Sequence, residues 1–85
     1  MTTKEIKTFV EKYNRMELDH ENMKRLESEM ADYQKRMRDK SITREEEVLY
    51  WMYIKGSDYA DADRWTAINR GEIKFGKQED GSIID

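Results

Sequence analysis

The sequence predicts a mainly α-helical protein, and three features of the chain support this prediction. Proline is absent from the 85 residues, and the first glycine is Gly56. Apolar residues in the first half recur at spacings of three and four, which places them on one face of a helix. Residues 48–54 are apolar on every side of a helix, so the other segments must cover that helix. We therefore predict helices over residues 3–39, 43–55 and 58–70, followed by a small C-terminal β-hairpin.

The first predicted helix, over residues 3–39, is long and amphipathic. Thr2 can cap its first turn, and Glu5 completes a capping box three residues later. A straight helix of this length measures about 55 Å, which is more than one chain of this size can cover. Its heptad-like apolar stripe is typical of a coiled coil. We therefore expect a homodimer, and its predicted seam consists of Met23, Leu26, Met30, Tyr33 and Met37.

An alternative is a break in this helix between Asn14 and Asp19, where weak helix formers cluster. Asp19 could then cap a second helix, with Leu18 and Met23 packed across the cap. Of the two arrangements we predict the continuous helix, completed by a second copy of the chain.

The two shorter helices have clear start and stop signals. A second capping box begins at Thr43, and Gly56 is suited to end the apolar central helix. Ser57 or Asp58 then caps the third helix, which Gly71 ends in the same way.

A β-hairpin is predicted over residues 72–85. Ile73 and Phe75 alternate with charged residues, and Ile83 and Ile84 lie beyond the turn pair Asp80 and Gly81. Of a two-residue turn and a five-residue loop over residues 77–81, we predict the longer loop, which sets Ile83 across from Phe75. A lone two-stranded hairpin is marginal in water, so we expect it to pack on the helices or to pair with another strand.

The composition narrows the range of functions. The chain has no cysteine and one histidine, which excludes disulfides and an ordinary structural zinc site. Residues 41–85 carry six Lys and Arg against ten Asp and Glu, which disfavours nucleic acid as a partner for this half. The longest apolar run is seven residues, far short of a membrane span, and no signal region is present. We therefore expect a soluble, cytoplasmic protein without a membrane partner.

No catalytic or metal-binding pattern is found. His20 stands alone beside the apolar stripe, without a second group for acid–base chemistry. Asp58, Asp61 and Asp63 do not have the spacing of a calcium loop. The four glycines stand singly, so no phosphate-binding loop exists. We predict no enzymatic activity, no metal and no cofactor.

Aromatic residues gather in the second half of the chain and are the best candidates for partner contacts, because such residues are enriched at binding hot spots. Trp51 and Tyr53 are two residues apart, so on a helix they cannot both face the same interior. The predicted partner-binding residues are Tyr50, Trp51, Tyr53, Asp58, Tyr59, Asp61 and Trp65.

Residues 42–59 resemble the opening helix of the helix-turn-helix domains of sigma-factor region 4 and of small phage transcription regulators. The matching residues are Thr43, Arg44, Glu45, Glu47, Val48, Leu49, Tyr53, Ile54, Gly56 and Tyr59. This resemblance implies a DNA-binding regulator. The chain departs from the family pattern after Tyr59, where the family continues with a support helix and a basic recognition helix. Here Asp61 and Asp63 follow instead, and they would repel the phosphate backbone of DNA.

Two functional hypotheses follow. The first is a small, non-enzymatic inhibitor or adaptor, of the kind that phages and mobile elements encode, which docks on a host protein or nucleoprotein complex. Its acidic second half would meet a basic surface of that partner. The second hypothesis is a dimeric helix-turn-helix-like regulator that binds DNA.

Overall fold

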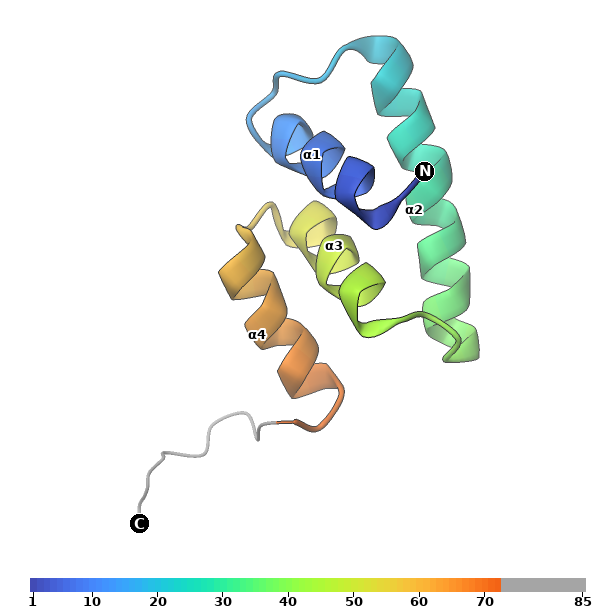
Figure 1. The fold of residues 1–85 in the computed structure, drawn as a ribbon, viewed down its shortest axis with the longest axis vertical. Helices are drawn as coiled ribbons and strands as arrows, with labels where there is room; N and C mark the ends of the chain where they lie inside the picture. Colours follow the sequence, from blue (N-terminus) through green and yellow to red (C-terminus); the bar gives the residue numbers. More distant parts are fainter. Residues whose placement is uncertain (73–85) are drawn as a thin grey trace.

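The computed structural model describes residues 1–72, which form four α-helices in the order α1 (Thr3–Asn14), α2 (His20–Asp39), α3 (Arg44–Lys55) and α4 (Tyr59–Asn69). The prediction of a mainly α-helical fold is confirmed. Figure 1 shows α3 between α2 and α4, with α1 lying against α3 and α2. Within residues 1–72 there is no β-strand, and residues 73–85 of the predicted hairpin lie outside the described residues.

The prediction of a continuous helix over residues 3–39 is wrong. The helix is instead broken between Asn14 and His20, as in the alternative arrangement. The backbone N–H of Glu17 donates to the carbonyl of Lys12 at 2.8 Å, which closes the end of α1. Met16 lies in the left-handed region with φ 60°. Leu18 then enters the core with 8% of its surface exposed. The reversal brings α1 back onto α3, so its apolar face is buried within one chain.

The predicted dimer seam faces the core of a single chain. Leu26, Met30 and Tyr33 on α2 are 0–3% exposed, and Met23 and Met37 are partly buried beside them. A second copy is therefore not needed to cover this stripe. The homodimer stays a prediction, and these residues are not free to form its seam in this arrangement.

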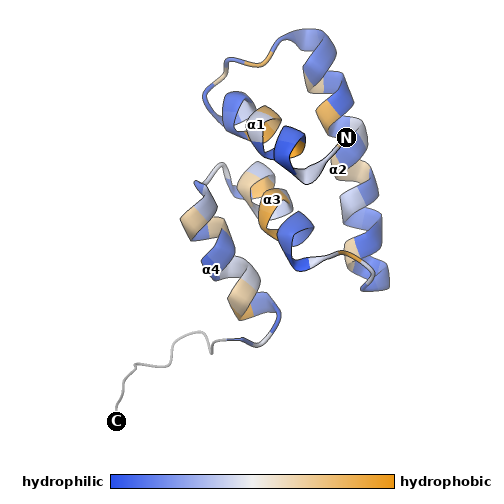
Figure 2. Ribbon diagram, in the orientation of Figure 1, coloured by the Kyte–Doolittle hydropathy of each residue, from blue (hydrophilic) through white to orange (hydrophobic). Residues whose placement is uncertain are grey.

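The centre of the core is α3, which packs against each of the other three helices. Val48, Leu49 and Met52 are at most 1% exposed, and Ile6 and Val10 of α1 meet them in the same cluster. Figure 2 shows this concentration of hydrophobic residues on α3 and the hydrophilic surface of α2. Burial of side chains of this size stabilises the fold by about 1.5–3 kcal/mol each.

Side-chain caps set the starts of three helices. Thr2 and Thr43 each accept a backbone N–H in the predicted capping boxes of α1 and α3. Of the two residues predicted to cap the third helix, Asp58 is the one used: its carboxylate accepts the N–H of Asp61 at 2.9 Å. Such caps contribute about 1 kcal/mol each.

In residues 1–72, no helix combines the length and the apolar character required to cross a membrane.

Candidate functional site

The predicted partner-binding residues lie on two different sides of the α3–α4 pair. Trp51 and Trp65 lie together on its outer side, where Tyr50 also contacts Trp51. Tyr53 instead packs on α1, and Tyr59 lies at the start of α4 beside Lys7 of α1. Their role in partner binding stays a prediction, and the sequence could not divide these residues between contacts within the fold and the surface.

The outer side of α3 and α4 carries a cluster that we call the aromatic face. Its members are Tyr50, Trp51, Ile54, Lys55 and Trp65. The ammonium of Lys55 lies 5.6 Å from the ring centroid of Trp51 and 4.6 Å from that of Trp65. The ring of Tyr50 meets Trp51 edge-on at 5.9 Å. Ile54 is 52% exposed, and among the large apolar side chains of residues 1–72 only Met16 is more exposed. The face therefore presents apolar and aromatic area to solvent around one cation.

Hydrogen bonds connect the aromatic face to the carboxylate of Glu47, a buried side chain that is 2% exposed. Its Oε2 accepts hydrogen bonds from Asn69 Nδ2 at 2.7 Å and from Trp51 Nε1 at 3.4 Å. Its Oε1 accepts one from Arg70 Nη1 at 2.9 Å. Because Glu47 joins α3 to the end of α4, it fixes both the indole of Trp51 and the guanidinium of Arg70.

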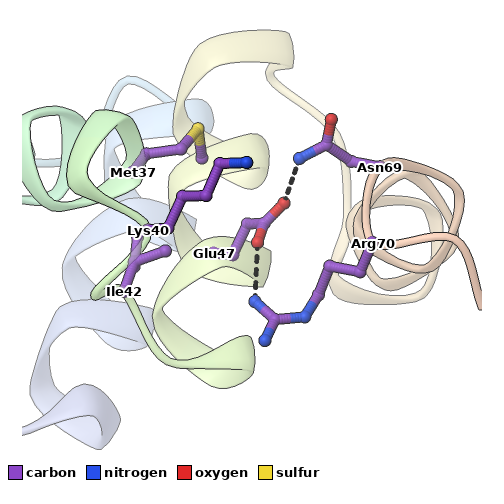
Figure 3. Close-up of a pocket in the computed structure, with 6 residues that line it drawn as sticks. All are labelled: Met37, Lys40, Ile42, Glu47, Asn69 and Arg70. Atoms are coloured by element: carbon purple, nitrogen blue, oxygen red, sulfur yellow. Dashed lines mark hydrogen bonds and ion pairs between the residues drawn. The ribbon is translucent and has the colours of Figure 1, made fainter.

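A pocket of about 450 Å³ lies beside Glu47, where the last turns of α2 and α4 approach the start of α3. Figure 3 shows α2 and its following loop on one side, α4 on the other, and Glu47 between them. The pocket is lined by Met37, Lys40, Ile42, Glu47, Asn69 and Arg70. Sequence reasoning missed it, because Glu47 looked like one of three equivalent glutamates at a helix start. A spacing of four between Glu47 and Trp51 was the available signal.

Tyr53 and Tyr59 have partners within the fold. The rings of Tyr13 and Tyr53 stack at 4.9 Å, and burial raises the pKa of Tyr53. The hydroxyl of Tyr59 donates to Glu45 at 2.7 Å, and this hydrogen bond is the main cause that raises the pKa of Tyr59 to about 12. Both tyrosines therefore fasten helices together rather than extend the aromatic face.

The acidic residues between positions 41 and 72 are largely paired inside the chain. Arg44 binds both Asp63 and Glu72, with a 2.8 Å contact to Glu72. Asp58 is used as a helix cap, while Asp61 is exposed. Within residues 1–72, no three acidic or histidine side chains gather closely enough to hold a metal ion. Most of the negative charge on residues 41–72 is therefore engaged within the chain and is less available to a partner.

No protein-family model, curated protein or solved structure matches this chain. The resemblance to sigma-factor region 4 therefore depends on residues 42–59 alone. The structure adds that α3 and α4 are consecutive helices joined by residues 56–58, with Gly56 at φ 65°.

Proposed function

We propose that this chain is a small non-enzymatic binding protein that docks on a partner protein through the aromatic face. The observation that carries the proposal is the approach of the partly exposed Trp51 and Trp65 to the same ammonium of Lys55, next to the 52% exposed Ile54 in the chain. Trp51 is partly buried against the core, whereas Ile54 and Trp65 are not among the residues of the core cluster or those packed against it, so their exposure is not a requirement of core packing. Tryptophan surrounded by apolar neighbours is the side chain most often found at the centre of a protein interface.

Lys55 adds a positive charge to the aromatic face. Its ammonium lies over two indole rings, so its charge is presented together with their apolar area. A partner that covers the indoles also meets this cation, which favours a partner surface with an acidic residue beside an apolar one. The partner class that fits is a host protein or nucleoprotein complex in the cytoplasm, bound by an adaptor or inhibitor of the phage or mobile-element kind. The assignment to the phage or mobile-element kind is based on the small size and the composition of the chain.

The test is affinity capture with matched variants. Tagged wild-type protein is incubated with host lysate, and the retained proteins are identified by mass spectrometry and then titrated as purified components. Ile54→Ser and Trp65→Ala are expected to weaken binding of the true partner by about tenfold or more, as for interface hot spots. Met16→Ser is the control, because Met16 is 92% exposed but lies in the loop between α1 and α2.

Two results would contradict this proposal. A partner that binds with equal affinity to the wild type, Ile54→Ser and Trp65→Ala would remove the aromatic face as the docking surface. The lack of any saturable protein partner would remove the function itself.

A DNA-binding regulator is the second candidate, favoured by the α3–turn–α4 order that resembles a helix-turn-helix. The charges oppose it, since Asp58 and Asp61 lie at the start of α4, where such a helix approaches phosphates. Duplex DNA should be titrated at low salt and again at higher salt. A steep loss of affinity with salt would support the regulator, and no binding at low salt would exclude it.

A further inference from the structure

Lys40 occupies a backbone position that favours glycine. It is the C-cap of α2 with φ 61°, a position that Gly56 occupies after α3 with φ 65°. After α4 the left-handed residue is again a glycine, Gly71, with φ 77°. Residues with a β-carbon rarely adopt this left-handed conformation, because the β-carbon crowds the following carbonyl. Met16 adopts the same conformation with an exposed side chain, so the reason for a lysine at position 40 must come from the surroundings of its side chain.

That side chain lines the pocket beside Glu47, which we call the Lys40 pocket. Figure 3 shows Lys40 with Met37 and Ile42 on one side, opposite Asn69 and Arg70 on the other. Within residues 1–72, the ammonium of Lys40 has no hydrogen-bond or ion-pair partner. Arg70, by contrast, is held in position by Glu47 at 2.9 Å, and its Nε lies 4.0 Å from Glu72. The pocket therefore has one fixed cation and one that is available.

The charges that line the pocket sum to a positive value. The carboxylate of Glu47 is offset by the guanidinium of Arg70, which leaves the full charge of Lys40. The ends of α2 and α4 contribute about half a negative charge each and the start of α3 about half a positive one, which together are smaller than the lysine charge. Asp39 precedes Lys40 in the chain but does not line the pocket.

We propose that the Lys40 pocket binds the carboxylate of an acidic residue on the partner protein. The carboxylate pairs with Lys40 and with the remaining donors of Arg70 and Asn69, while Met37 and Ile42 contact an apolar residue next to it in the partner. This inference rests on the proposed docking function and adds the chemistry of the partner segment. The pocket is joined to the aromatic face through the hydrogen bond from Trp51 to Glu47.

A singly charged group fits this pocket better than a phosphate. The uncompensated charge is smaller than that of one lysine, and the buried carboxylate of Glu47 repels a dianion about twice as strongly as a monoanion. The apolar wall formed by Met37 and Ile42 also suits a peptide side chain more than a highly hydrated dianion. An acidic peptide segment is therefore the ligand class that the charges and the wall favour together.

The test uses blocked dipeptides and amide chemical shifts of the ¹⁵N-labelled full chain. The probe is N-acetyl-Leu-Glu-amide, and the matched control is N-acetyl-Leu-Gln-amide, which has nearly the same shape without the charge. Saturable shifts at Lys40, Ile42 and Arg70 are expected with the glutamate probe. Binding of the glutamine probe is expected to be at least about tenfold weaker, because a charge-assisted hydrogen bond is lost.

Two variants keep the proposal falsifiable. Lys40→Gly relieves the backbone and therefore folds, yet it is expected to weaken the glutamate probe by about tenfold or more. Lys40→Arg retains the charge and is expected to bind within a few-fold of the wild type. Equal shifts with both dipeptides, unchanged binding in Lys40→Gly, or no shift up to the solubility limit would each overturn the proposal. Tighter binding of inorganic phosphate than of the glutamate probe would overturn the choice of a carboxylate.

The pocket and the docking function can fail separately. If the dipeptide does not bind but partner capture still depends on Trp65, the pocket is rejected and the aromatic face stands. If the dipeptide binds as expected but no saturable partner is found, the pocket stands as a carboxylate site and the docking function is rejected.

Discussion

Arg36 on α2 holds the carboxylate of Glu46 on α3 through two hydrogen bonds of 2.6 and 3.1 Å. The same carboxylate accepts the backbone N–H of Thr43 at 3.0 Å and so closes the capping box of α3. The guanidinium of Arg36 is the main cause that holds the pKa of Glu46 below its usual range. One side chain therefore fixes both the start of α3 and its contact with α2.

This arrangement predicts a loss of stability in acid. The pKa of Glu46 is lower in the folded than in the unfolded chain, so its contribution is complete above about pH 4.5 and is lost as the pH falls through the folded-state value. We expect Glu46→Gln to lower the free energy of unfolding by about 1 kcal/mol near neutral pH and by much less near pH 3. Urea unfolding at both pH values measures this, with Glu21→Gln as an exposed control. An equal loss at both pH values would show that the ion pair is not the cause.

Asn14 ties the end of α1 to the end of α3. Its Nδ2 donates to the backbone carbonyl of Met52 at 3.1 Å and to that of Ser57 at 3.3 Å. These carbonyls belong to the last turn of α3 and its following loop, where the helix cannot supply partners itself. Asn14→Ala is expected to lower the free energy of unfolding by about 1–3 kcal/mol. Chemical denaturation checks this value, and Asn14→Asp, which lacks the donor, should cost at least as much.

The local parts of this fold are predictable from the sequence because their causes are local. Each capping box needs only a threonine and a glutamate three residues later, so Thr2 and Thr43 mark the true helix starts. Gly56 and Gly71 likewise mark the helix ends, since their φ values are those that glycine adopts most easily.

The break after α1 is less predictable, because its cause is tertiary. No glycine marks the turn, and Met16 adopts the left-handed conformation in its place. What stabilises the reversal is burial of Ile6, Val10 and Leu18 against α2 and α3, which a helical spacing alone does not reveal. The site at Glu47 was missed for the same reason, since Asn69 and Arg70 reach it from more than twenty positions away in the chain.

The apolar residues of α2 are covered within one chain, so we predict that folding does not require a second copy. The midpoint of urea unfolding is expected to be the same at about 5 µM and at about 200 µM protein, because an obligate dimer would shift with concentration. Leu26→Ala is expected to cost about 2–5 kcal/mol through loss of core packing. Sedimentation of the wild type at both concentrations completes the test. A midpoint that rises with protein concentration would show instead that folding is coupled to dimer formation.

Thr66 places a hydroxyl in the core at a position that is 0% exposed. Its Oγ1 has no hydrogen-bond partner within the described residues. An unsatisfied buried hydroxyl costs about 1–3 kcal/mol, and valine has the same shape without it. Thr66→Val is therefore expected to raise the free energy of unfolding by about 1 kcal/mol, whereas Thr66→Ser keeps the hydroxyl and should not. Parallel urea titrations of the two variants separate the removal of the hydroxyl from any change of volume.

Met16 combines an unfavourable backbone conformation with an exposed apolar side chain. It has φ 60° and is 92% exposed, so its side chain gains almost no packing in return. Met16→Gly is expected to raise the free energy of unfolding by about 1 kcal/mol, because glycine adopts this conformation without a β-carbon clash. Gly56→Ala is the matched control, because it introduces a β-carbon at a left-handed position instead of removing one. A β-carbon there would meet nothing within 4 Å, so its expected loss of about 1 kcal/mol comes from the backbone alone. If Met16→Gly proves neutral or destabilising while Gly56→Ala behaves as expected, the methionine side chain must stabilise the turn through contacts of its own.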